Sequence, residues 1–261
     1  MSGDLRISDI SAGYRGRPVV RNLTLQPIAA GETVALVGPN AAGKSTLLRA
    51  LAGLLPATGS VTLDGRELIG LPLAERARLV SYMPQALPEG VALTVLETVI
   101  GALQASPTGE RTASSEEAAA RAVKVLERIG IAHLAMEPID RLSGGQRQLC
   151  GLAQALVRSP RLLLLDEPTS ALDLAFALRV LKLVRALAEE DSMTAILVLH
   201  DLQAAAKAAD RVVVLAHGDV AAEGPPGEAI TPGLLADVWQ VSARVDRCER
   251  GAIRIMVDDI V

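Results

Sequence analysis

The segment GPNAAGKST, residues 38–46, constrains the fold of this 261-residue chain more than any other feature. It fits the pattern G-x-x-x-x-G-K-[ST], and the apolar, β-rich run TVALVG leads into it. The residues that follow, KSTLLRALAGLL, have the hydrophobic spacing of a helix. A strand, a glycine-rich loop and a helix in this order are typical of a phosphate-binding loop. The alternative, a plain glycine turn between a strand and a helix, is disfavoured because the whole pattern is present.

The loop would hold a phosphate mainly through its backbone. N–H groups from residues 40–46 can surround a β-phosphate, and the positive end of the following helix adds to the attraction. Lys44 would reach the β- and γ-phosphates, and Ser45 Oγ would coordinate Mg²⁺. The predicted nucleotide-binding residues of this segment are Gly38, Pro39, Asn40, Ala41, Ala42, Gly43, Lys44, Ser45 and Thr46.

A second feature with chemical content is LLLLDEP, residues 162–168, an apolar run that ends in two carboxylates. Asp166 is placed to anchor Mg²⁺ at the end of a buried strand, and Glu167 to accept a proton from an attacking water. An acidic pair of this kind, taken alone, is often an ordinary strand-to-loop transition. The phosphate loop upstream favours the catalytic interpretation.

The order of the remaining segments predicts an α/β fold. Residues 5–37 alternate between apolar and polar positions, which indicates strands and turns, and GSVTLDGREL adds a strand and an Asp-Gly turn. After residue 160, short apolar strands alternate with helices, as in a buried and mainly parallel sheet. Residues 86–159 are rich in alanine and charge, which predicts an inserted helical subdomain. We expect one domain, 1–261, with a core of 1–85 and 160–240, the helical insertion 86–159 and a C-terminal hairpin 241–261.

The stretch LSGGQRQ lies inside the predicted helical insertion. Ser143 can cap the helix that continues it, and Gly144 and Gly145 leave backbone N–H groups open to an anion. The alternative is a serine-capped helix after a glycine turn, without further function. Because an insertion of this kind is poorly placed to fold back onto its own phosphate loop, the simplest geometry has a second copy of the chain present the stretch across an interface.

Four further polar residues, Tyr14, Gln85, Asp173 and His200, are weak signals individually. A single histidine or tyrosine of this kind is more often structural than functional. Each of the four, however, lies at a predicted strand end or in an adjoining loop. Open α/β sheets bind their ligands at that edge, so the four become candidates as a set.

Together these motifs resemble the ATP-binding subunit of ATP-binding cassette (ABC) transporters over nearly the whole chain. The resemblance implies an α/β fold of the P-loop NTPase (RecA-like) type with a mainly parallel sheet, an N-terminal antiparallel β subdomain and an inserted α-helical subdomain. It also implies ATP hydrolysis with ATP and Mg²⁺ as cofactors. The sequence departs from the family at Ala41, where glycine is usual. If that position needs a positive φ, alanine costs about 1 kcal/mol there but keeps its N–H.

The resemblance also assigns roles to the candidates. Tyr14 stacks on adenine, Glu167 is the general base and His200 contacts the γ-phosphate. The residues that arrange Mg²⁺ and the attacking water are Ser45, Gln85 and Asp166. The residues that cap the γ-phosphate of ATP bound to a second copy, in a head-to-tail dimer with two sandwiched nucleotides, are Ser143, Gly144, Gly145 and Gln146. Asp173 helps to couple the two sites.

The layout is most similar to importers of iron chelates (siderophores, haem) and vitamin B12. That branch implies two copies of a many-helix permease, an indirect link to a periplasmic binding protein, and a peripheral position on the cytoplasmic face of the bacterial inner membrane. The chain's own apolar runs fall short of the roughly 18 residues that a membrane helix needs. The two cysteines, Cys150 and Cys248, lack CxxC spacing, which fits a reducing compartment, and Cys150 is expected in the core.

Three alternatives stay open at this point. The first is an ATPase of the same fold in an exporter or another non-importer complex. The second is an ATPase that works on DNA or ribosomes, which the formal net charge of −4 and the lack of a long basic run disfavour. The third, a simple P-loop kinase or GTPase, leaves LSGGQ and His200 unexplained.

Overall fold

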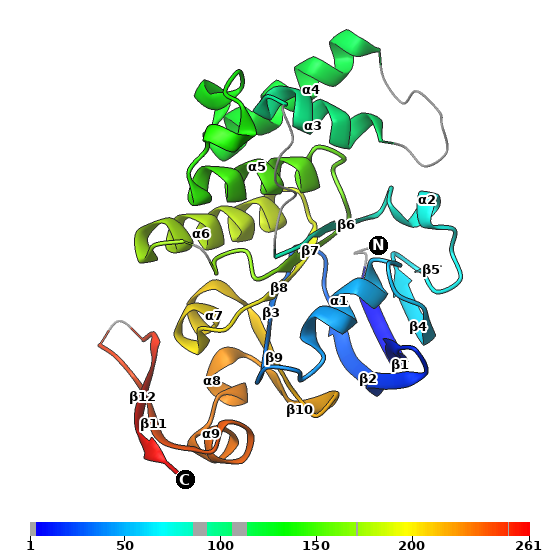
Figure 1. Ribbon diagram of the computed structural model, residues 1–261. Helices are drawn as coiled ribbons and strands as arrows, with labels where there is room; N and C mark the ends of the chain where they lie inside the picture. Colours follow the sequence, from blue (N-terminus) through cyan, green and yellow to red (C-terminus); the bar gives the residue numbers. More distant parts are fainter. Residues whose placement is uncertain (1–3, 86–92, 106–113, 171, 250) are drawn as a thin grey trace.

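The computed structural model of the protein describes residues 4–85, 93–105, 114–170, 172–249 and 251–261. A six-stranded sheet with the order β10-β9-β3-β8-β7-β6 runs through its middle (Figure 1). Five of these strands are parallel, and β10 runs antiparallel to β9 at one edge. The strands are β3 Thr33–Val37, β6 Val80–Met83, β7 Leu162–Asp166, β8 Thr194–Val198, β9 Arg211–Ala216 and β10 Asp219–Gly224. This mainly parallel sheet confirms the predicted fold class.

The two faces of this sheet are covered differently. Val34 and Leu36 of β3 pack in one core with helix α1 (Lys44–Leu51), whereas Ala35 and Val37 pack in a second core. That second core includes residues of α3 (Val95–Gln104), α4 (Ser115–Ile129), α5 (Gly144–Leu156), α6 (Leu174–Glu190) and α7 (Leu202–Ala208). Successive strand residues point to opposite faces, so an uninterrupted apolar strand such as TVALV fills both cores at once.

An antiparallel sheet packs on the α1 side. Its strands have the order β2-β1-β4-β5 and comprise β1 Leu5–Tyr14, β2 Arg17–Ile28, β4 Ala57–Leu63 and β5 Arg66–Glu67. The turn between β4 and β5 is formed by Asp64 and Gly65, both with positive φ (53° and 79°). A type I′ hairpin turn needs positive φ at both positions, which an Asp-Gly pair supplies. The predicted strand and Asp-Gly turn are confirmed.

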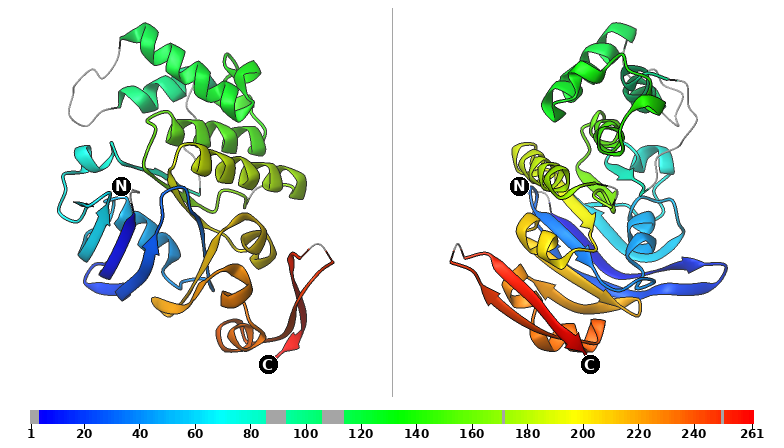
Figure 2. Two further views of the ribbon diagram at one scale, coloured as in Figure 1. Left: turned by 180° about the vertical axis from the view of Figure 1, so that it is seen from behind. Right: turned by 60° about the vertical axis from the view of Figure 1, so that its left-hand side comes forward.

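The inserted region is helical, as predicted, in the part that the structure describes. Helices α3, α4 and α5 lie together at one end of the molecule (Figures 1 and 2), with the short 3₁₀ turns η1 (Ala132–Leu134) and η2 (Ile139–Arg141) between α4 and α5. Each of the three helices begins with a reciprocal capping box, at Thr94, Ser114 and Ser143 respectively. Residues 86–92 and 106–113 of the predicted insertion lie outside the described residues.

The C-terminal part adds α8 (Pro226–Ala229), α9 (Pro232–Trp239) and a hairpin of β11 (Val241–Arg247) and β12 (Ile253–Ile260), and α2 (Leu73–Arg76) precedes β6. The hairpin confirms the predicted C-terminal strands, although Arg250 of its predicted turn lies outside the described residues. Gln203 of α7 holds β12, because its side chain donates to the Ile253 carbonyl and accepts a hydrogen bond from the Ile255 N–H. The hairpin is thereby tied to the helix that follows His200.

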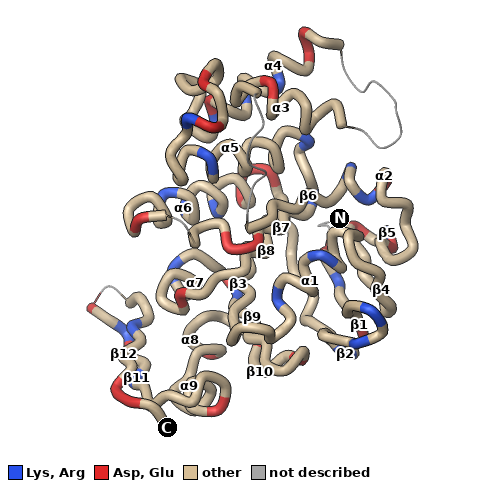
Figure 3. The backbone as a smooth tube through the Cα atoms, in the orientation of Figure 1, with Lys and Arg blue, Asp and Glu red and all other residues tan. Residues whose placement is uncertain are grey.

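Lys and Arg positions are interspersed with Asp and Glu positions along the backbone in all layers of the molecule (Figure 3). Several form ion pairs at the surface, such as Arg128 with Asp191 and Arg244 with Asp258. Exposed pairs of this kind contribute little to stability individually. Within the described residues, no helix has the length and apolar character required to cross a bilayer.

Candidate active site

The phosphate loop connects the end of β3 to the start of α1, as the sequence predicts. Gly38 is required there, because a Cβ at this position would lie 2.1 Å from the carbonyl oxygen of Leu215 on the adjacent strand. The Lys44 ammonium turns back over the loop and donates to the carbonyl oxygens of Gly38 (2.7 Å) and Pro39 (2.8 Å). Burial lowers the pKa of Lys44, and the nearby Glu167 and Asp166 partly counter that effect. A cation held among backbone groups in this way suits a phosphate.

Ala41 has a φ of 63° in the middle of the loop. The sequence leaves open whether this position needs a positive φ, and the structure shows that it is left-handed. An alanine in this region carries a steric penalty of about 1 kcal/mol that glycine avoids. Its N–H is kept, so the loop retains the donor that a phosphate requires.

The carboxylate of Asp166 is buried, with 2% of the residue exposed, where β7 ends beside the start of α1. Ser45 Oγ donates to Asp166 Oδ1 at 2.9 Å, so the two predicted metal-site residues are in direct contact. Hydroxyl and carboxylate oxygens are ligands that suit Mg²⁺. No cluster of three or more His, Cys, Asp or Glu side chains suited to a metal occurs in the described ranges. A cation at Ser45 and Asp166 would take its further ligands from phosphate oxygens, water and the predicted third residue, Gln85.

Glu167 is the centre of a second cluster, one residue further along. Gln85 Nε2 donates to Glu167 Oε2 at 2.6 Å, and His200 Nε2 lies 2.5 Å from Glu167 Oε1. The parallel register explains this meeting, because Met83 pairs with Leu165 and Asp166 with Val198, and the three side chains follow just beyond those pairs. Three candidates predicted separately are thus brought together at one sheet edge.

The backbone of Glu167 is strained, with a φ of 53°. A positive φ raises the free energy of a residue that has a β-carbon, because the β-carbon is crowded by the backbone. Such strain is concentrated at functional sites, where the surrounding structure holds it. The conformation turns the chain sharply after β7, so the side chains of Asp166 and Glu167 meet different partners. The sequence gives no signal for this strain.

Two residues that the sequence analysis did not single out complete this edge of the site. Tyr82 on β6 donates its hydroxyl to Asp166 Oδ2 at 3.0 Å. Arg49 on α1 donates to the hydroxyls of both Tyr82 (3.4 Å, from Nε) and Tyr14 (3.1 Å, from Nη1). Arg49 follows Ser45 by four residues and therefore lies on the same face of α1, which is the one available signal. Tyr14, the predicted adenine-stacking residue, is partly exposed at the end of β1.

The stretch LSGGQRQ, residues 142–148, forms the signature turn at the start of α5 and lies elsewhere. Ser143 Oγ accepts a hydrogen bond from the Gln146 N–H (3.3 Å), and Gln146 Oε1 accepts one from the Ser143 N–H (2.9 Å), so Ser143 caps α5 as predicted. In the described part of the chain these two side chains bond to each other's backbone and not to residues 38–46. Helices α5 and α1 pack in different cores, on opposite faces of the sheet.

Asp173 caps α6 by accepting a hydrogen bond from the Phe176 N–H at 2.8 Å. The Phe176 ring lies against the signature turn, since a Cβ on Gly145 would come within 2.9 Å of it. The structure therefore brings Asp173 and the signature glycines into one neighbourhood, separate from the phosphate loop. Beside them, Leu174 is 75% exposed, which is unusual for a leucine.

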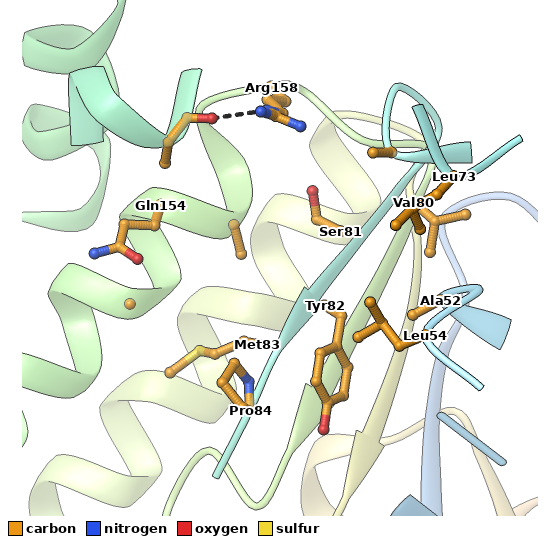
Figure 4. Close-up of a pocket in the computed structure, with 14 residues that line it drawn as sticks. Ala52, Leu54, Leu73, Val80, Ser81, Tyr82, Met83, Pro84, Gln154 and Arg158 are labelled. Atoms are coloured by element: carbon orange, nitrogen blue, oxygen red, sulfur yellow. Dashed lines mark hydrogen bonds between the residues drawn. The ribbon is translucent and has the colours of Figure 1, made fainter. Parts of the chain in front are cut away.

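A groove of about 330 Å³ lies between β6 and the C-terminal half of α5 (Figure 4). Tyr82, Met83 and Pro84 form part of its wall, and Gln85 follows directly. Other lining residues are Ala52, Leu54, Leu73, Ala77, Val80, Ser81, Ala102, Gly151, Gln154, Ala155 and Arg158. Most of these side chains are apolar, so the groove suits an apolar segment of a partner.

Comparison with known proteins places these features in a family. The ABC transporter family model matches residues 20–170. The chain is 38% identical over 259 residues to the hemin import ATP-binding protein HmuV of Shewanella denitrificans, covering 97% of this chain and 100% of that one. It is 37% identical to the ferric enterobactin transport ATP-binding protein FepC of Escherichia coli, covering 90% and 86%.

Solved structures agree with this result. An inward-facing ABC transporter of metal-chelate type shares the fold, with a TM-score of 0.82, 24% identity and 99% and 98% of the two chains covered. An ATP-binding cassette in its ADP conformation has a TM-score of 0.76 and 25% identity, with 88% and 93% covered. The predicted resemblance is confirmed: the chain belongs to the ABC transporter family and is one of its ATP-binding, ATP-hydrolysing subunits.

Proposed function

We propose that this chain is the ATPase subunit of a membrane importer that takes up an iron chelate (haem or a ferric siderophore) or cobalamin through a partner permease. One observation carries the hydrolytic part: Glu167 is held between Gln85 and His200 beside the phosphate loop. The similarity to hemin and enterobactin import subunits over nearly the whole chain supports the transported class.

Each residue of the site has a proposed role in ATP binding or hydrolysis. The loop amides of residues 40–46 and Lys44 bind the phosphates, and Tyr14 stacks on adenine. The oxygen atoms that would hold Mg²⁺ belong to Ser45, Gln85 and Asp166. When bound, the cation would neutralise charge on the β- and γ-phosphates.

Glu167 is the proposed general base. Gln85 and His200 each contact one of its two oxygens, and its side chain is only 14% exposed. A water that approaches the γ-phosphate needs one of these oxygens as a proton acceptor. His200 can then move from Glu167 to the γ-phosphate, which leaves Glu167 available. The site is thus poised rather than active until nucleotide is bound.

The working unit is a head-to-tail dimer with two sandwiched ATP molecules. Ser143, Gly144, Gly145 and Gln146 would cap the γ-phosphate bound to the other copy, and Asp173 would help to couple the two sites. The separation of the signature turn from its own phosphate loop supports this arrangement. The exposed Leu174 beside Asp173 supports an interface at this place.

The groove between β6 and α5 is the proposed docking site for a cytoplasmic helix of the permease. Its wall continues into Gln85, so a helix seated there lies close to the catalytic edge. Two permease copies would accompany the dimer, with a periplasmic binding protein in indirect contact. This places the chain peripherally on the cytoplasmic face of the inner membrane, without nucleic acid as a partner.

Reconstitution tests this proposal. The chain and a candidate permease are placed in lipid vesicles with ATP and Mg²⁺, together with a candidate binding protein. ATP-driven uptake of haem, a ferric siderophore or cobalamin, abolished by Lys44→Ala, is the expected result. ATP-driven movement of cargo only in the outward direction would contradict import and favour the exporter alternative.

A further inference from the structure

The buried carboxylate of Asp166 has a hydrogen-bond donor on each of its oxygens. Ser45 Oγ donates to Oδ1 (2.9 Å) and Tyr82 OH donates to Oδ2 (3.0 Å). The carboxylate of a residue that is only 2% exposed needs such partners, because burial of an unpaired charge is costly. Ser45 belongs to the phosphate-loop motif, but Tyr82 belongs to no motif of the sequence.

The direction of the Tyr82 hydroxyl is fixed by Arg49. A tyrosine hydroxyl has one hydrogen to donate and can also accept. Arg49 Nε donates to the Tyr82 oxygen, so the acceptor side is occupied and the single hydrogen is left for Asp166. The same guanidinium holds the hydroxyl of Tyr14 with a second nitrogen. The result is a continuous chain of contacts from Tyr14 through Arg49 and Tyr82 to Asp166.

We propose that Tyr82, oriented by Arg49, is a positioning residue that holds Asp166 in the geometry required for a divalent cation beside the phosphate loop. This inference rests on the proposed function and assigns it a residue outside the recognised motifs. Partners that hold a metal-site carboxylate from behind affect metal affinity strongly, typically by about 10- to 100-fold. Tyr82 acts through Asp166 and touches neither nucleotide nor cation.

The position of Tyr82 explains why the contact is rigid. Its backbone is paired within the parallel sheet between β6 and β7, opposite Leu164. Its ring lies in the wall of the groove with Ala52 and Leu54, and its hydroxyl points away from Gln154 and Arg158 (Figure 4). Tyr82 therefore joins the groove wall to the carboxylate of Asp166. Gln85, which follows that wall in the sequence, bonds the other carboxylate, that of Glu167.

Tyr82→Phe is the direct test, because it removes the hydroxyl and keeps the ring. We would titrate Mg²⁺ and measure binding of a fluorescent ATP analogue to the full chain, with an EDTA sample as the metal-free reference. The Mg²⁺ concentration for half-maximal effect should rise by about tenfold, while binding in EDTA stays as in the wild type. Arg49→Lys, at an exposed position, should raise it by about threefold, because lysine cannot bridge two hydroxyls with a planar fork.

Thr194→Val is the matched control. It removes a buried hydroxyl from β8 of the same sheet, where Thr194 Oγ1 donates to the Ala29 carbonyl, far from the metal edge. It should lower stability by an amount similar to Tyr82→Phe and leave the Mg²⁺ dependence unchanged.

The outcomes separate the two proposals. An unchanged Mg²⁺ dependence in both Tyr82→Phe and Arg49→Lys would overturn the positioning role while the wild type still binds Mg²⁺ and ATP. Equal shifts in Tyr82→Phe and Thr194→Val would overturn it too, because general loosening would then explain the effect. A wild-type chain whose nucleotide binding ignores both Mg²⁺ and Lys44→Ala would overturn the proposed function itself.

Discussion

The phosphate-loop edge and the signature turn differ in how far one chain completes them. At the phosphate-loop edge, Lys44, Asp166 and Glu167 each have partners supplied by other elements of the same chain. At the signature turn, the side chains of Ser143 and Gln146 bond only to each other's backbone within the described contacts. In the proposed function both meet an anion, yet the helices that begin there, α1 and α5, pack on opposite faces of the central sheet.

A site can therefore be rigid although a single chain does not complete it. The signature turn is held by its capping box and by the Phe176 ring beneath Gly145, so its geometry does not depend on a ligand. Its open N–H groups nevertheless have no phosphate of their own to bind. We infer that the first region is an active site lacking a cap and the second is a cap lacking an active site.

Glu167→Gln should produce the largest change at the phosphate-loop edge. The amide keeps the shape of the side chain but cannot accept a proton from water, so ATP turnover should fall by at least about 100-fold. ATP binding should remain, and a closed dimer should accumulate, which size-exclusion chromatography with ATP would detect. Glu190→Gln, at an exposed ion pair with Arg128, serves as the charge-matched control. Rapid hydrolysis by Glu167→Gln would rule out this residue as the base.

Ser143→Ala tests the signature turn against a closely matched control. Ser114 caps α4 with the same capping box, so Ser114→Ala should lose a similar stability, about 1 kcal/mol, in chemical denaturation. Only Ser143→Ala should also lose ATP turnover, by about tenfold, if its hydroxyl meets a phosphate. Equal ATP turnover in the two variants would show that Ser143 only caps its helix and does not contact a phosphate.

Ala41→Gly should have a small effect on the phosphate loop. Glycine relieves the strain of the positive φ, so the free energy of unfolding should rise by up to about 1 kcal/mol. The N–H is unchanged, and ATP affinity should stay within about tenfold of the wild type. Ala42→Gly, at the next position and outside the positive-φ set, should instead lower stability. A larger shift in affinity would mean that strain at Ala41 shapes the phosphate site.

Cys150 should show the smallest effect of all, although it lies in the signature helix. Burial raises the pKa of this thiol to about 11, so only about 0.1% is thiolate at pH 8, against about a quarter for an ordinary cysteine. Iodoacetamide at pH 8 should spare it in the folded chain and leave turnover unchanged, whereas unfolding in guanidinium should expose it. Mass spectrometry of the modified peptides distinguishes it from Cys248. Fast labelling in the folded state would show that α5 is loosely packed.

Much of this site follows from the sequence, because its motifs lie at the ends of parallel strands. Asp166, Glu167 and His200 follow apolar runs, and parallel strand ends necessarily meet at one edge. The Ser143 cap was also predictable, since a capping box is a local pattern. These features depend on residues close in sequence or on the register of a sheet.

The rest depends on tertiary packing. The contact between Tyr82 and Asp166 requires the twist of β6 beside β7 and the reach of Arg49 from α1, which no local pattern encodes. The positive φ of Glu167 is likewise imposed by the surrounding structure. Neither the strain nor the hydroxyl chain has a sequence signature of its own.

Mixing two inactive variants tests whether the cap of one phosphate site is supplied by the partner copy. Lys44→Ala destroys the phosphate site of its copy, and Ser143→Arg destroys the cap of its copy. In a mixed dimer, one site combines the intact phosphate loop of the second variant with the intact cap of the first. ATP turnover of the mixture should rise well above that of either variant, up to about a quarter of wild type if sites act independently. Turnover no higher than that of either variant alone would contradict a cap supplied by the partner copy.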